Sequence, residues 1–227
     1  LAADFDRIEL WHADTDAVAH DTGAFASAGI TVAGKALHAA CLTLARRMRE
    51  RAAALTGTDA ASASLTSTGV ETPAGLVGFA ELCADGDLSA DGSELGEQRS
   101  LAFNVHAVRV AVDPTTGTVR ILQSIQSADA GFVMNPAQCR GQIEGGVAQG
   151  IGSALYEEVM VSPQGKVTTP IFRTYRVPQF ADVPETEVYF ADTSDDLGPF
   201  GAKSMSESPY NPVAPAIGNA IARARKT

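Results

Sequence analysis

The loop Gly198–Pro209, with the sequence GPFGAKSMSESP, combines small residues with one carboxylate. Glu207 lies a few residues before a segment that starts near Pro212 and has the pattern of a helix. Backbone amides and the positive end of a helix dipole favour an ionised carboxylate, and small neighbours leave room for a substrate. Glu207 is therefore a candidate general base. A glutamate before a helix is more commonly a cap or a solvated charge, so both interpretations stay open.

A second segment, Gly141–Tyr156, has the apolar spacing of a buried helix but is rich in glycine. Apolar residues recur at helical spacing at Ile143, Val147, Ile151 and Leu155. Glycines occupy positions 141, 145, 146, 150 and 152. Each glycine in a helix costs roughly 1 kcal/mol relative to alanine, so this many are expected where another backbone or a ligand approaches closely. A polar face that could meet a ligand consists of Gln142, Gly146, Gln149 and Ser153. Tight helix–helix packing is the alternative, and the residues alone favour it slightly.

Two further helices are expected around these segments. Residues Ala33–Leu55 predict a long helix with one apolar face formed by Leu37, Cys41, Leu44 and Met48. Near the C-terminal end of the sequence, Asn211 is expected to cap a helix that begins at Pro212 and turns Val213, Ile217 and Ile221 inward.

Strands are predicted from β-rich runs and turn signals. Two such runs between Leu101 and Ile125 flank Asp113–Gly117, where Asp, Pro and a late Gly predict a hairpin turn. Other expected strands are Ile8–His12, Val159–Val161 and Glu187–Phe190. Polar stretches at residues 56–64 and 85–98 are candidate subdomain edges.

Composition excludes several classes of protein. The 227 residues are 45% hydrophobic, which is enough for a sizeable core. The 17 Lys and Arg against 27 Asp and Glu give a formal charge of −10 without a basic stripe, so we expect no nucleic-acid partner. No apolar stretch approaches the ~20 residues that span a bilayer, so we expect a soluble chain without a membrane partner. Three widely spaced cysteines without a C-x-x-C motif favour a reducing cytoplasm. The histidines lack metal-ligand spacing, and no G-x-S-x-G motif of a hydrolase occurs.

Four short segments follow one another along nearly the whole chain. They are TGAFAS (Thr22–Ser27) with GKA from Gly34, SLTSTG (Ser64–Gly69), Asn135–Pro136 with GQIEGG (Gly141–Gly146) and Gln149–Gly150, and GAK (Gly201–Lys203) with Glu207. In type and order they resemble the xanthine dehydrogenase and aldehyde oxidase family of molybdenum hydroxylases. Four spaced motifs in order are far more specific than any one of them.

The resemblance implies a role for each matching residue. Glu207 would be the general base, and Gln142 would contact the pterin cofactor. Ala26 and Ser27 would lie against the pterin and the ligands of the metal. Gly29 and Ser206 are the other expected cofactor contacts. Molybdenum would be held by molybdopterin, in its plain or its cytosine dinucleotide form, with no metal ligand from the protein.

The resemblance also implies a reaction and partners. The reaction would be the oxidation of a heteroaromatic or aldehyde carbon with oxygen from water. Electrons would leave through two-iron, two-sulfur (2Fe–2S) clusters and FAD, neither of which has a binding motif in this chain. We therefore expect partner iron–sulfur and FAD subunits, an N-terminal portion of the molybdenum subunit, a small-molecule substrate and an oligomer. The alternative is a non-catalytic structural or assembly module that binds no cofactor when isolated.

The expected fold class is α+β, with two packed α/β subdomains of mixed sheets and helices, as in the C-terminal half of the molybdenum-binding region of this family. The whole chain, residues 1–227, would be the C-terminal portion of the molybdopterin-binding domain. Because the first residue is Leu1, we expect a piece of a longer or processed chain.

The sequence departs from the family pattern at the segment Ser204–Ser206 and at two single positions. Ser204-Met-Ser206 stands where relatives have glycines around an aliphatic residue, and Gly29 stands where relatives can offer a hydroxyl. Phe25 replaces a small residue close to the substrate and would either narrow the substrate pocket or pack against neighbouring residues.

Lys203, four residues before Glu207, either helps to stabilise the negative charge of Glu207 or is a surface lysine.

Overall fold

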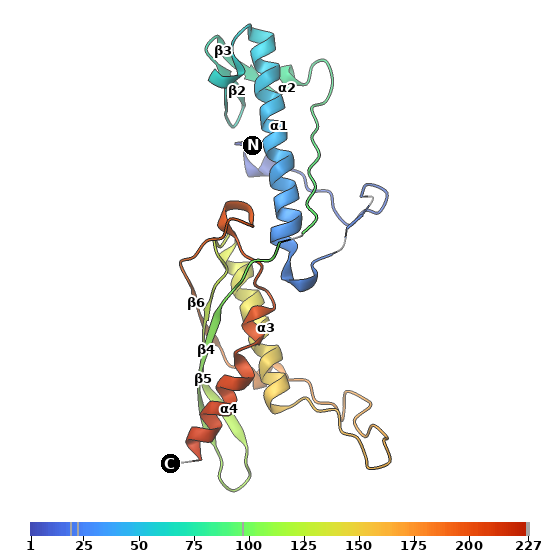
Figure 1. Ribbon diagram of the computed structural model, residues 1–227, viewed down its shortest axis with the longest axis vertical. Helices are drawn as coiled ribbons and strands as arrows, with labels where there is room; N and C mark the ends of the chain where they lie inside the picture. Colours follow the sequence, from blue (N-terminus) through green and yellow to red (C-terminus); the bar gives the residue numbers. More distant parts are fainter. Residues whose placement is uncertain (19, 22, 97, 226–227) are drawn as a thin grey trace. The chain divides into compact units, whose positions relative to one another are not determined.

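The computed structural model describes residues 1–18, 20–21, 23–96 and 98–225 (Figure 1). Thr22, the first residue of one of the family-like segments, lies outside the described residues. The chain forms two units, one of Leu1–Phe25 with Thr31–Glu97 and one of Ala26–Ile30 with Gln98–Thr227. Each unit combines helices with a small sheet, so the fold class is α+β as expected. No described helix is long and apolar enough to cross a membrane.

The first unit contains most of the long helix α1 (Gly29–Thr56) and a small antiparallel sheet. Its strands are β1 (Ser64–Leu65), β2 (Gly69–Thr72) and β3 (Gly75–Gly78), in the order β1-β2-β3, followed by the short helix α2 (Phe79–Leu82). The core of this unit consists of Met48, Ala52, Ala63, Val70, Val77 and Leu82. The predicted helix Ala33–Leu55 is confirmed within α1. Its predicted apolar face is buried only in part, because Met48 is 8% exposed whereas Leu37 is 62% exposed.

The strand predicted at Ile8–His12 is wrong. A single 3-10 turn (Phe5–Arg7) precedes this segment, and the segment pairs with no described strand. Leu10 and Trp11 are 74% and 76% exposed. A β-rich run becomes a strand only where a partner supplies its hydrogen bonds, and no described strand of the first unit does so here.

The second unit is built on a three-stranded sheet (Figure 1). The strands β4 (Asn104–Val112) and β5 (Val119–Ala128) form the predicted hairpin, and Asp113 Oδ1 accepts hydrogen bonds from the amides of Thr115 and Thr116 in the turn. The strand predicted at Glu187–Phe190 is confirmed within β6 (Thr186–Phe190), which runs parallel to β5. The strand predicted at Val159–Val161 is wrong, because among the described residues this segment forms only an isolated bridge, from Val161 to Val167.

Two helices, α3 (Pro136–Leu155) and α4 (Val213–Ala224), pack on one face of this sheet. Their shared core consists of Val147, Ile151, Val213 and Ile217, with Val108 of β4 and Ile121 of β5 against it. The side chain of Asn135 caps α3 at the amide of Gln138, so this helix begins five residues before the predicted start. Asn211 does not cap α4, contrary to the prediction. Its backbone is already helical (φ −58°, ψ −43°), because the 3-10 turn Ser208–Tyr210 leads directly into α4.

Candidate active site

The Glu207 side chain is exposed and meets a residue far away in the sequence, Ser27. The Ser27 hydroxyl donates a hydrogen bond of 2.9 Å to Glu207 Oε2, and the Glu207 amide donates one of 2.9 Å back to Ser27 Oγ. Both residues belong to the second unit. Glu207 Oε1 has no hydrogen-bond partner among the described residues. The candidate base and one of the candidate cofactor residues are therefore in direct contact, and one carboxylate oxygen remains free.

Ala26 and Ser27 adopt a left-handed backbone conformation, with φ values of 52° and 58°. Residues other than glycine rarely do so, and each such residue costs of order 1–3 kcal/mol. The strain persists only where surrounding contacts impose it, and the paired hydrogen bonds with Glu207 are such contacts. Gly29, the other candidate in this segment, begins α1 and has no positive φ.

The loop is anchored on the N-terminal side of Glu207. The amide of Ser204 donates a hydrogen bond of 3.2 Å to Ser100 Oγ. Met205 is 7% exposed and packs in a core with Ile143 of α3, and its sulfur lies 3.9 Å from Cys139 Sγ. The backbone before Ser206 is therefore held by both polar and apolar contacts.

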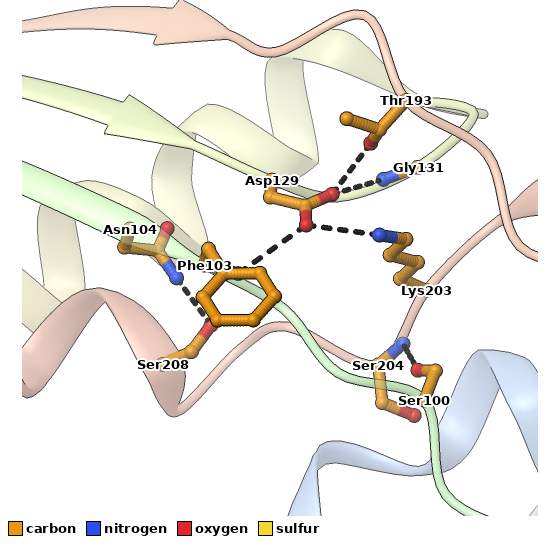
Figure 2. A network of polar contacts seen from close by, with 9 residues as sticks. All are labelled: Ser100, Phe103, Asn104, Asp129, Gly131, Thr193, Lys203, Ser204 and Ser208. Atoms are coloured by element: carbon orange, nitrogen blue, oxygen red, sulfur yellow. Dashed lines mark hydrogen bonds and ion pairs between the residues drawn. The ribbon is translucent and has the colours of Figure 1, made fainter.

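The loop is anchored on the C-terminal side as well. Asn104 Nδ2 donates a hydrogen bond of 2.7 Å to Ser208 Oγ (Figure 2). The Ser208 hydroxyl donates one of 2.7 Å to the carbonyl of Met205. Gln126 Nε2 reaches the carbonyl of Pro209 at 3.4 Å. Within the described loop, Ser206 is half-buried and its hydroxyl has no hydrogen-bond partner. The fold thus fixes both flanks and leaves the hydroxyl of Ser206 and one oxygen of Glu207 available.

Lys203 does not hold the charge of Glu207, and it is not a surface lysine. Its ammonium lies 2.9 Å from Asp129 Oδ2, and the two side chains are 11% and 6% exposed. Asp129 also accepts hydrogen bonds from the Thr193 hydroxyl at 2.5 Å and from the amides of Phe103 and Gly131, each at 3.3 Å. Figure 2 shows these groups around the carboxylate. The sequence hypothesis failed because residue spacing gave no indication of Asp129, which lies 74 residues away.

The Asp129 carboxylate is stabilised in its charged form. Burial by itself raises the pKa of Asp129, but the hydrogen bonds from Thr193, Lys203, Phe103 and Gly131 outweigh burial and hold the pKa below its ordinary value. Asp129 is therefore ionised at neutral pH, where it is paired with Lys203.

Four of the five glycines of α3 fall into two groups. An added Cβ at Gly146 would lie 3.3 Å from Pro209 Cβ, and one at Gly150 would lie 2.5 Å from Val213 Cβ. These glycines serve close packing against the segment that follows Glu207 and against α4, which was the favoured interpretation. An added Cβ at Gly141 or Gly145 would meet nothing within 4 Å. Helix packing does not explain these two glycines.

Gln142 lies on the exposed surface of α3, one helical turn before Gly146. Its side chain makes no hydrogen bond to any described residue, so it is not hydrogen-bonded to Ser27 or Glu207. Because Gly146 packs against Pro209, the polar face of α3 and the Glu207 loop are neighbours. At the far end of this face, Tyr210 Oη donates a hydrogen bond of 3.0 Å to Ser153 Oγ.

The buried face of the sheet carries polar residues that sequence reasoning missed. Asn104 Oδ1, His106 Nδ1 and Gln126 Oε1 are buried and have no hydrogen-bond partner in the described part of the chain. Burial lowers the pKa of His106, and the neighbouring Gln126 amide opposes this only in part. Asn104 and Gln126 hold the Glu207 loop through their hydrogen bonds to Ser208 and Pro209. The available signal was the run of polar residues at alternate positions of two predicted strands.

The available groups fit a pterin better than a metal ion bound by side chains. No group of three or more His, Cys, Asp or Glu suited to a metal ion occurs among residues 1–18, 20–21, 23–96 and 98–225. The free amide of Gln142 and the free hydroxyl of Ser206 offer donors and acceptors of the kind that bind the ring nitrogens and carbonyls of a pterin. Gly141 and Gly145 leave open space beside Gln142.

Comparison with known proteins decides the family. The model of the molybdopterin cofactor-binding domain matches residues 1–184. This chain belongs to that family. The match includes the candidate residues Ala26, Ser27, Gly29 and Gln142, whereas Ser206 and Glu207 lie beyond it.

Relatives of this molybdopterin cofactor-binding domain extend the similarity to the Glu207 loop. The chain is 31% identical over 231 residues to the 6-hydroxypseudooxynicotine dehydrogenase complex subunit gamma of Paenarthrobacter nicotinovorans, which covers 95% of this chain and 29% of the relative. It is 34% identical over 223 residues to the putative xanthine dehydrogenase molybdenum-binding subunit of Escherichia coli (strain K12), covering 92% of this chain and 29% of the relative. The chain therefore spans less than a third of these relatives.

Solved structures agree on the fold of this domain. Quinoline 2-oxidoreductase from Pseudomonas putida 86 matches with a TM-score of 0.76 at 29% identity, over 88% of this chain and 28% of that chain. The reconstituted CO dehydrogenase from Oligotropha carboxidovorans matches with a TM-score of 0.85 at 21% identity, over 93% of this chain and 28% of that chain. The second match, at its low identity, shows the fold alone.

Proposed function

We propose that residues 1–227 are the C-terminal portion of the molybdopterin-binding domain of a molybdenum hydroxylase, in which Glu207 is the general base. The substrate would be a heteroaromatic compound or an aldehyde, oxidised with oxygen from water. Family membership and the names of the relatives support the class of enzyme. The observation that carries the proposal for this site is the hydrogen bond from Ser27 to Glu207, because it joins the candidate cofactor segment to the candidate base.

Each candidate residue has a defined task in this proposal. Gln142 would bind the pterin through its free amide, Ala26 and Ser27 would contact it from the strained segment, and Gly29 and Ser206 would lie beside it. The cofactor, molybdenum–molybdopterin in its plain or cytosine dinucleotide form, supplies the oxidant when bound. Glu207 would take the proton of the attacking oxygen nucleophile on Oε1, the carboxylate oxygen that Ser27 leaves free. The hydroxyl of Ser27, which donates a hydrogen bond to Oε2, would hold the Glu207 carboxylate in one orientation.

The proposal requires partners that this chain does not supply. These are an N-terminal portion of the same molybdenum subunit and subunits or domains that carry 2Fe–2S clusters and FAD. One relative is named as a subunit of a complex, which supports a multi-subunit assembly. We expect the isolated chain to hold little molybdenum, because roughly half of the cofactor contacts would be missing. Metal analysis of the purified chain checks this, and one molybdenum per chain would contradict it.

The test of the base is the substitution Glu207→Gln in the complete enzyme with its partners. General acid–base catalysis contributes typically 10²–10⁴-fold, so we expect kcat to fall by about that factor. Molybdenum and pterin contents should stay at the level of the unmodified enzyme. The matched control is Glu158→Gln, which also removes an exposed carboxylate and should leave kcat unchanged. Full turnover by Glu207→Gln would refute the assignment.

A further inference from the structure

The ion pair of Asp129 and Lys203 is the most buried ion pair among the described residues, and the proposed chemistry does not use it. Both side chains are nearly inaccessible, and Asp129 receives four hydrogen bonds (Figure 2). Burying two charges removes their hydration, and well-packed apolar residues often stabilise a fold as well or better. Stability therefore gives a weak reason for this ion pair, whereas fixing one particular backbone geometry gives a stronger one.

The contacts around the ion pair hold the start of the Glu207 loop on the segment that follows β5. The amide of Lys203 donates a hydrogen bond of 3.0 Å to the carbonyl of Ala130, and the amide of Phe132 donates one of 3.0 Å to the carbonyl of Gly201. Ala202 forms a bridge with Gly131. The approach is so close that an added Cβ at Gly131 would lie 2.2 Å from the Gly201 oxygen. Lys203 is the last residue of this paired stretch. The ion pair of its side chain with Asp129 fixes how residues 201–203 are aligned with residues 130–132.

The same carboxylate connects segments distant in sequence. Phe103 leads into β4, and Thr193 lies after β6. β4 begins with Asn104, which holds Ser208 on the other side of Glu207. Asp129 thus binds Lys203 on one side of Glu207 directly, and it binds the residue next to Asn104, which holds Ser208 on the other side. It makes no hydrogen bond to Glu207 or Ser27.

We propose that Asp129 and Lys203 are positioning residues for Glu207. Their ion pair sets the position of the Glu207 loop and therefore the position of the Glu207 carboxylate. This inference rests on the proposed role of Glu207 as the base. It predicts that loss of the ion pair lowers kcat while KM and cofactor content stay constant, because neither residue would contact substrate or pterin. A displacement of about 1 Å in a reacting group can cost on the order of 10²-fold in rate, so we expect kcat to fall roughly 10- to 100-fold.

The test uses the complete enzyme with three variants: Asp129→Asn, Lys203→Met and the double variant Asp129→Asn with Lys203→Met. Each single variant leaves one polar partner buried without its ion pair, so a lower melting temperature is expected. The double variant removes both charges and should recover most of that loss. Its kcat should nevertheless stay low, with KM unchanged. Glu50→Gln, which breaks the exposed Arg46–Glu50 ion pair at 2.9 Å, is the control and should leave kcat unchanged.

Amide hydrogen exchange gives a second measurement that does not depend on turnover. In the double variant, the Lys203 amide should exchange about tenfold faster than in the unmodified protein, because its strand-like pairing loosens. A double variant whose kcat and exchange equal those of the unmodified enzyme would overturn the proposal, and so would a rise in KM at constant kcat. If Glu207→Gln keeps full activity, the proposed base is wrong, and the exchange measurement still decides whether the ion pair fixes the loop.

Discussion

The contact between α3 and α4 gives a quantitative prediction from two glycines of the same helix. An alanine at position 150 would place its Cβ 2.5 Å from Val213 Cβ and 2.8 Å and 2.9 Å from the two Val213 methyl groups. Ordinary carbon contacts are about 3.5–4.0 Å, so the helices must separate by roughly 1 Å. Val213 is 0% exposed, and rotation of its side chain moves the methyl groups but not Cβ. We therefore expect an overpacking cost near the top of the usual range, about 3 kcal/mol.

Gly145→Ala is the matched substitution without a clash, because its Cβ would meet nothing within 4 Å. Both substitutions gain about 1 kcal/mol of helix propensity. The net expectation is that Gly150→Ala lowers the free energy of unfolding by about 2 kcal/mol and Gly145→Ala raises it by about 1 kcal/mol. The melting temperatures should then change by about −4 to −8 °C and +2 to +4 °C. Thermal denaturation followed by circular dichroism measures both. Equal stability of the two variants would refute the packing geometry.

Two further predictions concern stability elsewhere in the chain. Because burial lowers the pKa of His106, the unfolded state binds more protons than the folded state just below the ordinary histidine pKa of about 6.5. The contribution of His106 to the free energy of unfolding is therefore complete above about pH 6.5 and is lost as pH falls. Urea unfolding at pH 7.5 and 5.5 measures this loss of free energy, which should be smaller in His106→Gln than in the unmodified protein. An equal loss in both proteins would contradict this. In the first unit, a Cβ at Gly92 would lie 2.0 Å from the Ala36 carbonyl, so Gly92→Ala should loosen residues 85–96 from α1 and speed their proteolysis. Gly78→Ala has open space around its Cβ and should be cut at the unmodified rate; indistinguishable rates for both variants would refute the close approach.

Periodicity and turn chemistry were sufficient to predict the elements that depend on local sequence. The stripe of Ile143, Val147 and Ile151 is buried as expected, and the Asp113 turn joins two strands. Elements that depend on a distant partner were not predictable in this way. Ile8–His12 has a β-rich composition but no described strand beside it. Asn211 lost its expected capping role because the preceding residues Ser208–Tyr210 already form a helical turn.

The site was predictable only as far as its motifs could be matched. The sequence directed attention to Glu207, Ser27 and Gln142, yet spacing alone gave no reason to pair Ser27 with Glu207. The residues that hold the loop in place could not be predicted, because Asp129, Asn104 and Gln126 belong to strands and turns without a motif of their own. The same limit explains the error at Lys203, whose partner is distant in sequence and near in space.

The hydrogen bond between Ser27 and Glu207 has a consequence for biosynthesis, because it joins residues 180 positions apart. Ribosomes build chains from the N-terminus, so the strained Ala26–Ser27 segment exists long before its partner is made. Its left-handed backbone lacks this stabilising contact until the Glu207 loop has been synthesised and has docked on Asp129, Asn104 and Gln126. The contact between Ser27 and Glu207 is therefore among the last parts of the second unit to form, and the candidate site is complete only after the Glu207 loop has folded.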